Sequence, residues 1–477
     1  MSSIYWYDLE TFGINSRRDR IAQFAGLRTD FDLNPLSTSE MFYCKPALDT
    51  MVDPESCLIT GITPQECEEK GVIESEFAQN INQIFSEAGT CVAGYNSIRF
   101  DDEFIRNLNY RNLIDPYARE YAKGNSRWDV IDMVRATYAL RPEGIEWPRH
   151  EDGKPSFKLE DLTKANNLQH ESAHDALSDV LATIAISKLI KQKQPQLFQY
   201  YFNLKRKSEV LKQIAVGIMK PIVHISGMIP AERGCLSIML PLCAHPKNSN
   251  GIICYDLNYN PDDLIHLDAD EIQDRIYTPQ ADLPEGVERI HLKTIHVNKS
   301  PFVAPLSALK NVDLERIQLN YQETKKHLEK LKKADDLSQK VQSVFSQEFD
   351  NDNLDIDEML YSGFFHPSDR ELFNRVSQWP VEKILESSFS FKDPRGSELL
   401  SRYLARNHFD QLNTKSQKHW ISSIKKRLET QYGSHLELWF EKYKVLNTQN
   451  LDSDQNFIMK QVESFITNKL NTLIKTS

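Results

Sequence analysis

The sequence predicts an N-terminal α/β domain, a small β-rich domain and a helical C-terminal domain. Three changes of pattern along the 477 residues support this division. Strand-like and helix-like segments alternate up to about residue 190, short β-rich runs follow from Lys220, and helical periodicity returns near Asp313. A chain of this length exceeds what one hydrophobic core holds. We expect domain boundaries that give 1–193, 194–349 and 350–477.

The first domain shows both periodicities of an α/β fold. Residues 4–10 and 90–96 are typical of strands, whereas 75–89 and 174–193 have the spacing of amphipathic helices. Strands that alternate with helices favour a sheet with helices packed against it.

The segments from residue 220 onward show a different residue pattern. Short runs at 220–229, 235–245, 251–257 and 288–297 are separated by turn residues, which indicates a small β-barrel or sandwich. The acidic stretch 350–358 looks like a linker, because it lacks the Gly and Glu that a calcium loop needs at its sixth and twelfth positions. The helical remainder has Trp379, Trp420 and Trp439 as expected core anchors.

Composition sets limits on the class of protein. The net charge of −11 excludes a uniformly basic surface, although a local basic groove can exist within an acidic protein. The first residues lack the pattern of a signal peptide, and no stretch has the apolar length of a membrane span. Seven cysteines without a C-x-x-C spacing argue against a disulfide framework or zinc knuckle. We expect a cytoplasmic protein that does not bind a membrane.

Two carboxylates, Asp8 and Glu10, stand at the end of a run that otherwise suggests a buried strand. Side chains at i and i+2 of a strand point to the same face, so these acids would project together. A bound divalent cation would relieve their repulsion, and an edge strand that runs into solvent is the alternative.

Two further segments add acids and a histidine. Asp101 and Asp102 follow an apolar strand-like run, and His174 precedes Asp179 by five residues on an expected helix. Taken singly, each of these residues could be an ordinary surface group or a helix-start residue.

Taken in order, the pattern D-x-E, N-x-x-x-F-D and H-x-x-x-x-D resembles the DEDDh branch of the 3′–5′ exonuclease superfamily. Longer stretches, among them "LITGITPQE", "AGYNSIRFDDEF", "SFKLEDLTKAN", "HVNKSP" and "YSGFF", resemble the bacterial exonuclease I family over nearly the whole chain. The resemblance implies a ribonuclease-H-like exonuclease domain, an SH3-like β-domain with a helical extension and an all-α C-terminal domain. It also implies a groove, closed by the last two domains, beside the active site.

The same resemblance implies the reaction and its residues. A single strand of DNA would be degraded from the 3′ end to 5′-mononucleotides, in DNA repair and recombination, by hydrolysis with two Mg²⁺ ions, or with Mn²⁺ in their place. Two divalent ions can activate water and steady the leaving oxygen. Glu10 would bridge both ions and touch the substrate, Asp102 is the weaker candidate for a ligand, and His174 fits the general base. The implied metal ligands are Asp8, Glu10, Asp101 and Asp179.

Substrate contacts are expected where aromatic and basic residues interleave, because bases stack on rings while cations meet phosphates. The alternative is a pair of amphipathic helices with a charged exterior. Lys158 stands where the family often has Arg, so it would meet a phosphate as a point charge. The matching positions are Arg106, Tyr117, Tyr121, Arg135, Phe157 and Lys158. Weaker candidates in the second domain are Lys207, Asn250, His296 and Lys299.

The resemblance further implies a monomer that docks the acidic C-terminal tail of single-stranded-DNA-binding protein through basic and apolar residues. Lys220 is a candidate for that contact, whereas a basic docking position of the family aligns with Tyr321 here. Two other functions stay open from the sequence: a 3′ exoribonuclease of the same superfamily, since the carboxylates cannot read the 2′-OH, and a catalytically silent DNA-end-binding protein.

Overall fold

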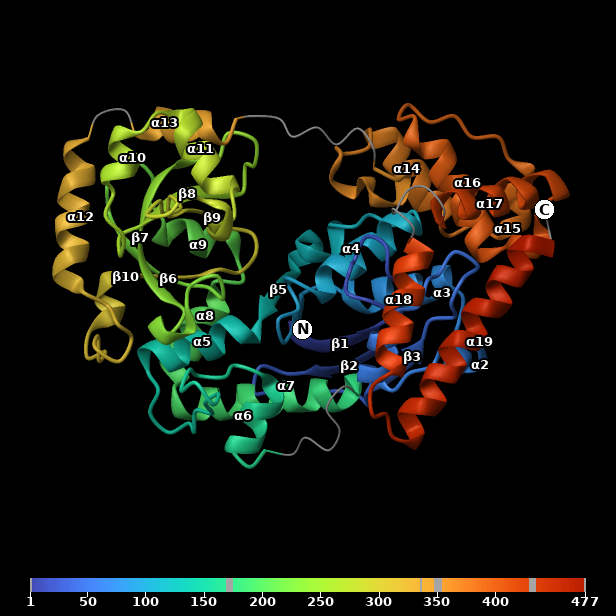
Figure 1. Cartoon of the computed structure of the whole chain (residues 1–477), viewed down its shortest axis with the longest axis horizontal. Helices are drawn as coiled ribbons and strands as arrows, with labels where there is room; N and C mark the ends of the chain where they lie inside the picture. Colours follow the sequence, from blue (N-terminus) through green and yellow to red (C-terminus); the bar gives the residue numbers. More distant parts are fainter. Residues whose placement is uncertain (1, 169–174, 335–336, 347–353, 429–434, 476–477) are drawn as a thin grey trace. The chain divides into compact units, whose positions relative to one another are not determined.

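The computed structural model describes residues 2–168, 175–334, 337–346, 354–428 and 435–475. The chain divides into two compact units, which we describe separately (Figure 1). Unit 1 comprises Met1–Ser126, Glu171–Leu181 and Asn351–Ser477, and unit 2 comprises Arg127–His170 and Ala182–Asp350. The two ends of the chain therefore belong to the same unit.

A five-stranded sheet with the order β3-β2-β1-β4-β5 forms the centre of the first unit. β1 is antiparallel to β2 and parallel to β4, so it lies in the interior of the sheet. The strands are β1 (Ser3–Thr11), β2 (Ile21–Thr29), β3 (Glu40–Tyr43), β4 (Thr90–Gly94) and β5 (Ser126–Asp129), of which only the first residue of β5 belongs to unit 1.

The alternation of side chains along β1 determines which face of the sheet Asp8 and Glu10 occupy. Tyr5, Tyr7 and Leu9 pack into one aromatic core with Phe24 and Phe85. Because successive side chains of a strand point to opposite faces, Asp8 and Glu10 project from the other face, as expected from the sequence. The register with β2 shifts between Glu10 and Thr11, at a β-bulge. Bulges re-aim side chains and are frequent beside active sites.

Helices from both ends of the chain pack in unit 1. The N-terminal helices are α1 (Pro54–Thr60), α2 (Pro64–Lys70), α3 (Glu74–Phe85), α4 (Asp101–Arg111), η1 (Ala118–Glu120) and η2 (Ala122–Gly124). The C-terminal helices are η6 (Ile356–Tyr361), α14 (Pro367–Val376), α15 (Val381–Glu386), α16 (Arg395–Asn407), η7 (Phe409–Gln411), α17 (Thr414–Lys426), α18 (His435–Asn447) and α19 (Ser453–Lys475). α7 (Ala176–Lys193) begins in unit 1 and continues in unit 2.

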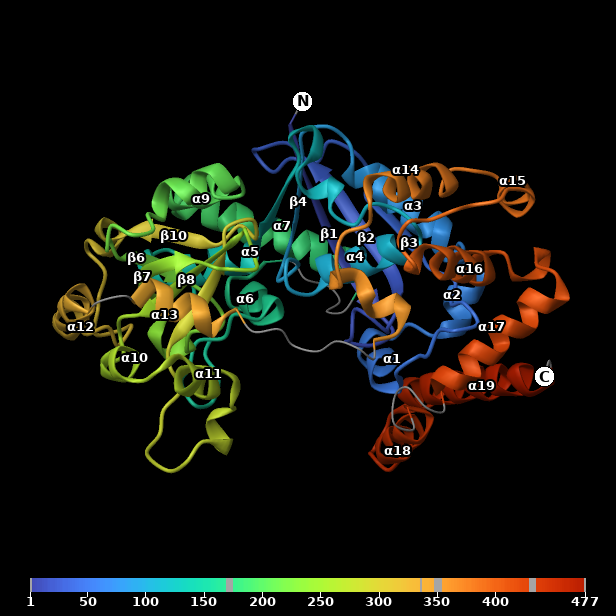
Figure 2. The ribbon, with the colours of Figure 1, turned by 90° about the horizontal axis from the view of Figure 1, so that it is seen from above.

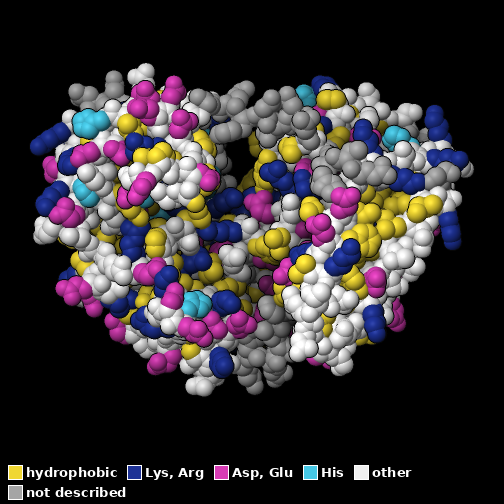
Figure 3. Space-filling view, viewed as in Figure 1, with side chains coloured by type: hydrophobic (Ala, Val, Ile, Leu, Met, Phe, Trp, Pro, Cys, Tyr) yellow, Lys and Arg dark blue, Asp and Glu magenta, His cyan; other side chains and the backbone are white. Residues whose placement is uncertain are grey.

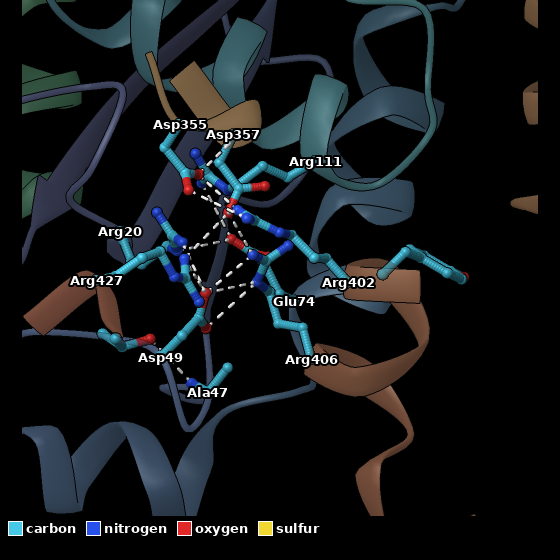
Figure 4. Close-up of polar contacts among 12 residues, drawn as sticks. Arg20, Ala47, Asp49, Glu74, Arg111, Asp355, Asp357, Arg402, Arg406 and Arg427 are labelled. Carbon is cyan, nitrogen blue, oxygen red and sulfur yellow. Dashed lines mark hydrogen bonds and ion pairs between the residues drawn. The ribbon is translucent and has the colours of Figure 1, made fainter. Parts of the chain in front are cut away.

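The C-terminal helices are held by apolar and ionic contacts within unit 1. Trp439 of α18 packs with Cys57 of α1 and donates a hydrogen bond of 2.6 Å to the Val52 carbonyl oxygen. A buried cluster of arginines and carboxylates forms the ionic contact (Figure 4). The interpretation of 350–358 as a linker is wrong for its described part. Asp355, directly before η6, and Asp357, within it, are buried and accept hydrogen bonds from Arg402 as acids of this cluster.

Unit 2 contains a second five-stranded sheet, with the order β10-β6-β7-β8-β9 and antiparallel pairing throughout. α11 and α13 lie side by side, and α13 packs against β7 (Figure 2). Trp128 is fully buried against Phe198 and Phe202 of α8, so it belongs to the core. The strands are β6 (Ile222–Ile225), β7 (Leu236–Ala244), β8 (Gly251–Asp256), β9 (Leu292–His296) and β10 (Phe302–Pro305). The helices are α5 (Val130–Leu140), α6 (Leu159–Ala165), α8 (Pro195–Asn203), α9 (Lys207–Gln213), η3 (Ala231–Arg233), α10 (Asp262–His266), α11 (Ala269–Tyr277), η4 (Gln280–Asp282), η5 (Leu306–Leu309), α12 (Tyr321–Lys333) and α13 (Leu337–Val344).

Charged side chains of both signs are interspersed on the face drawn in Figure 3. All seven cysteines are buried. None of the helices in the described residues has the length and apolar character that a membrane span requires.

Candidate active site

Three carboxylates meet at the end of β1. Oxygen atoms of Asp8, Glu10 and Asp179 all lie within 4.8 Å of one another. Asp8 and Glu10 come from the interior strand of the sheet, and Asp179 comes from the first turn of α7. Glu10 is buried, and the other two side chains are half-buried. The structure therefore brings together acids that are 171 residues apart in sequence (179 − 8).

Their electrostatics favour a bound cation. Burial, followed by the charges of Asp8 and Asp179, raises the pKa of Glu10 to about 9. Burial and the charge of Asp179 likewise raise the pKa of Asp8 well above its usual value. Carboxylates held this close repel one another unless a proton or metal ion intervenes. An all-oxygen donor set of this kind suits a hard divalent cation such as Mg²⁺.

Asp101 and Asp102 begin α4 and differ in their surroundings. Both are buried, but Asp102 accepts hydrogen bonds from the Tyr7 hydroxyl at 2.8 Å and from Arg119 at 2.7 Å. Asp101 is not one of the three grouped carboxylates. Its charge nevertheless contributes to the raised pKa of Tyr7 on β1, after the larger effects of burial and of Asp102. Asp102 is thus a structural residue of the core. The expected base, His174, lies outside the described residues.

The expected DNA-contacting residues of unit 1 adjoin α4. Arg106 is buried and donates two hydrogen bonds to Glu120, at 2.7 and 2.9 Å, and one to Glu103 at 2.9 Å. Its guanidinium also lies over the ring of Tyr117, 5.4 Å from the centroid. Tyr121 is 67% exposed. Tyr117 and Tyr121 can therefore offer ring surface, whereas Arg106 is already bound by carboxylates.

Two aromatic residues that sequence reasoning missed adjoin this group. Phe364 is 81% exposed, and its ring lies edge-on to Tyr117 with centroids 5.8 Å apart. Tyr361 accepts a hydrogen bond of 3.1 Å from Arg106 and donates one to Glu103. The stretch "YSGFF" contains both, and Gly363 has φ 121°, a conformation that other residues rarely adopt. The sequence feature that could have identified these two residues is the pair of aromatic side chains on either side of a turn glycine.

Three of the expected contacts in unit 2 lie near α5 and α6. Arg135 pairs with Asp132 at 2.8 Å and packs so closely on Gly227 that a side chain at that glycine would clash with the guanidinium. Phe157 is half-buried, edge-on to Tyr138. Lys158 is exposed, and its amino group lies 3.7 Å from Glu160.

The other candidates of unit 2 gather beside β8 and β9. The Lys207 amino group donates a hydrogen bond of 2.6 Å to the Asn250 side chain. Burial, followed by the charge of Lys299, lowers the pKa of His296 to about 4, so its imidazole is neutral at pH 7. The Lys299 N–H donates to the His296 carbonyl oxygen at 3.1 Å. These polar groups therefore lie near one another beside β8 and β9.

A separate cavity of about 290 Å³ lies in unit 2, between α8 and the region of β10 and η5. Most of its wall is apolar, and Arg141 supplies the cationic group. Lys220 is exposed two residues before Ile222, which pairs with Pro305 in the cavity wall. The apolar lining comprises Leu140, Leu197, Tyr200, Phe302, Ala304, Pro305 and Ala308.

Known proteins match nearly the whole chain. Family models described as exonuclease, exonuclease I SH3-like domain and exonuclease I C-terminal domain match residues 5–187, 205–347 and 354–469. Exodeoxyribonuclease I of Haemophilus influenzae is 44% identical over 97% of this chain and 98% of its own length.

Solved structures agree with these matches. Exonuclease I of Methylocaldum szegediense has a TM-score of 0.94 and 45% identity, covering 98% of this chain and 100% of its own. The zinc-bound complex of Escherichia coli exonuclease I with single-stranded DNA has a TM-score of 0.93 and 40% identity, with the same coverage.

Proposed function

Since the chain belongs to the bacterial exonuclease I family, we propose that Asp8, Glu10, Asp101 and Asp179 hold two Mg²⁺ ions for the hydrolysis of DNA. The protein is an exonuclease that degrades single-stranded DNA in the 3′ to 5′ direction. The close approach of the Asp8, Glu10 and Asp179 carboxylates is the observation that supports this metal site. Bound divalent ions would lower the pKa of an attacking water and stabilise charge on the leaving oxygen.

The chain's own residues supply the rest of the chemistry. Asp8 and Glu10 are fixed by an interior strand, and Asp179 by the start of α7, so little reorganisation is needed when a metal binds. His174 removes the proton of the attacking water, because imidazole titrates near neutral pH.

A strand of DNA is held by stacking and by cations. We assign stacking in unit 1 to Tyr117, Tyr121 and Phe364, whose rings are adjacent or exposed. Arg106 holds the Tyr117 ring in place. It binds a phosphate only if it gives up hydrogen bonds to a carboxylate partner such as Glu120. In unit 2 the proposed phosphate and base contacts are Arg135, Phe157, Lys158, Lys207, Asn250, His296 and Lys299.

The assignment is tested by Asp179→Ala. This variant is expected to lose both nucleotide release and Mg²⁺ binding, measured by calorimetry on the protein without DNA, because it removes one ligand from a small set. End-labelled single-stranded DNA, duplex DNA and RNA, each with and without Mg²⁺, measure the substrate preference. Retention of Mg²⁺ affinity in Asp179→Ala contradicts the site.

We further propose that the cavity beside α8 binds the acidic, partly apolar tail of single-stranded-DNA-binding protein. Apolar tail residues suit its wall, and Arg141 and Lys220 supply positive charge. Arg141→Ala is expected to weaken binding of a tail peptide without changing activity on bare DNA, and Lys326→Ala, on exposed α12, serves as the control. Equal affinity in both variants contradicts this docking site.

We also propose that the protein acts as a monomer in the cytoplasm, with domain boundaries near residues 193 and 350. Sedimentation of the free protein tests the oligomeric state, and limited proteolysis tests the boundaries.

A further inference from the structure

Asp175, which no motif of the sequence singled out, lies directly before α7 and four residues before Asp179. Its Oδ2 atom accepts a hydrogen bond of 3.1 Å from the Ser178 N–H, and its carbonyl oxygen accepts one of 3.0 Å from the Asp179 N–H. This is the geometry of a helix N-cap, in which the side chain satisfies a backbone donor of the first turn. Asp175 therefore fixes the turn that carries Asp179.

The cap also holds the Asp175 carboxylate against the first turn of α7, the turn that presents Asp179 to Asp8 and Glu10. Asp175 nevertheless lies outside the group of carboxylates whose oxygens are within 4.8 Å of one another. The Asp175 carboxylate is thus held one helical turn from Asp179 without belonging to that group.

Capping the helix does not by itself require a charged side chain at position 175. Asn and Ser cap helices about as well as Asp, and a fourth carboxylate adds repulsion to an already crowded group of acids. The added charge becomes favourable when divalent cations are bound, because it then adds attraction instead of repulsion. Carboxylates beyond the ligands commonly accept hydrogen bonds from metal-bound water or ligating groups and tune metal affinity.

We propose that Asp175 is a positioning residue of the metal site: its cap sets the orientation of Asp179, and its charge strengthens divalent-cation binding from outside the ligand shell. This inference rests on the proposed metal site. It assigns to Asp175 two separable contributions, one through the cap and one through the charge.

The experiment separates the two contributions. Asp175→Asn keeps the capping oxygen and removes the charge, whereas Asp175→Ala removes both. We expect Asp175→Asn to keep the wild-type Tm while its affinity for Mg²⁺ or Mn²⁺, measured by calorimetry without DNA, falls about tenfold. Its cleavage rate is expected to recover at high Mg²⁺, because the ligands are intact. Asp175→Ala is expected to lose metal affinity and also to lower the Tm.

Asp53→Asn is the matched control. Asp53 caps α1 in the same unit, accepting hydrogen bonds of 2.8 and 3.2 Å from the N–H groups of Glu55 and Ser56. Its neutralisation is expected to leave metal affinity unchanged. Wild-type metal affinity in Asp175→Asn overturns the inference while the metal site stands. Failure of the wild type to bind metal, or full binding by Asp179→Asn, overturns the proposed site itself.

Discussion

Arg406 of α16 and Asp49 are joined by hydrogen bonds of 2.9 and 3.2 Å across 357 residues of sequence. Both side chains are fully buried, and Arg406 also donates to Asp357 of η6 at 2.8 Å. Figure 4 shows these residues among further arginines and acids of unit 1. The C-terminal helices are therefore tied to the N-terminal segment by charges that have no access to water.

Asp49→Ala is expected to destabilise the protein by about 3–5 kcal/mol, because it leaves buried arginines without their counter-charge. Chemical denaturation measures this loss. Glu66→Ala provides the control, since Glu66 pairs with Lys70 on an exposed helix face and such pairs contribute about 0.5 kcal/mol or less. Similar losses in the two variants would show that the buried cluster does not stabilise the fold.

Stability is also expected to fall in acid. Although burial alone would raise it, Arg406, Arg20 and Arg427 hold the pKa of Asp49 well below its usual value. A carboxyl with a depressed pKa stabilises the fold fully above its unfolded-state pKa of about 4, and this contribution is lost as pH falls further. The Tm of the wild type should therefore drop below about pH 4, and that of Asp49→Asn should depend less on pH there. Parallel pH profiles would contradict this assignment.

The cluster also shows where sequence reasoning stops. Strand and helix periodicity is a local property, so the segments around Asp8 and 75–89 could be predicted from it. The pairing of Asp49 with Arg406 has no local pattern, and the acids of 355–358 looked like a solvated linker for that reason. The same holds for Arg111, which stands in a basic and aromatic stretch typical of a DNA contact but is fully buried.

Tyr121→Ala and Phe364→Ala are each expected to weaken binding of single-stranded DNA by about 1–3 kcal/mol, the usual value of one stacked base. Both rings are exposed, so their removal should leave the Tm unchanged. Phe457→Ala, which removes an exposed ring of α19, is the control and should bind normally. Fluorescence anisotropy with a labelled oligonucleotide measures the affinity. Wild-type affinity in the first two variants would exclude these rings from the DNA path.

The candidate site was predictable to a different degree at each position. The resemblance of the motifs to a known family implied Asp8, Glu10 and Asp179 as metal ligands, and the structure places their carboxylates together. Phe364 and Asp175 belong to no such motif. Only the structure identified them, Phe364 by the exposure of its ring and Asp175 by its capping hydrogen bond.

His174→Ala is expected to slow single-turnover cleavage by about 10²- to 10⁴-fold while leaving Mg²⁺ and DNA affinity nearly unchanged. Raising the pH should restore part of the lost rate, because hydroxide then attacks without help from an imidazole. The wild type should lose activity as the pH falls below neutrality and the imidazole becomes protonated. Loss of metal affinity in His174→Ala would instead make this residue part of the ligand set.

Asp101 and Asp102 are adjacent and both buried, yet opposite outcomes are expected for their substitution. Asp102 accepts hydrogen bonds from Tyr7 and Arg119, so Asp102→Asn should lower the Tm because it leaves the buried Arg119 guanidinium without its nearer carboxylate, Glu120 being 4.0 Å away. Asp101→Asn removes a proposed metal ligand, so it should abolish cleavage and weaken Mg²⁺ binding.

Three measurements on the same two variants decide this last expectation: the Tm without metal, the Mg²⁺ affinity, and the cleavage rate at saturating Mg²⁺. A variant at position 102 that is less stable but still binds Mg²⁺ and cleaves DNA at moderate temperature agrees with a structural carboxylate. If Asp102→Asn instead loses metal at an unchanged Tm, the ligand is Asp102, and the bonds from Tyr7 and Arg119 serve to orient it.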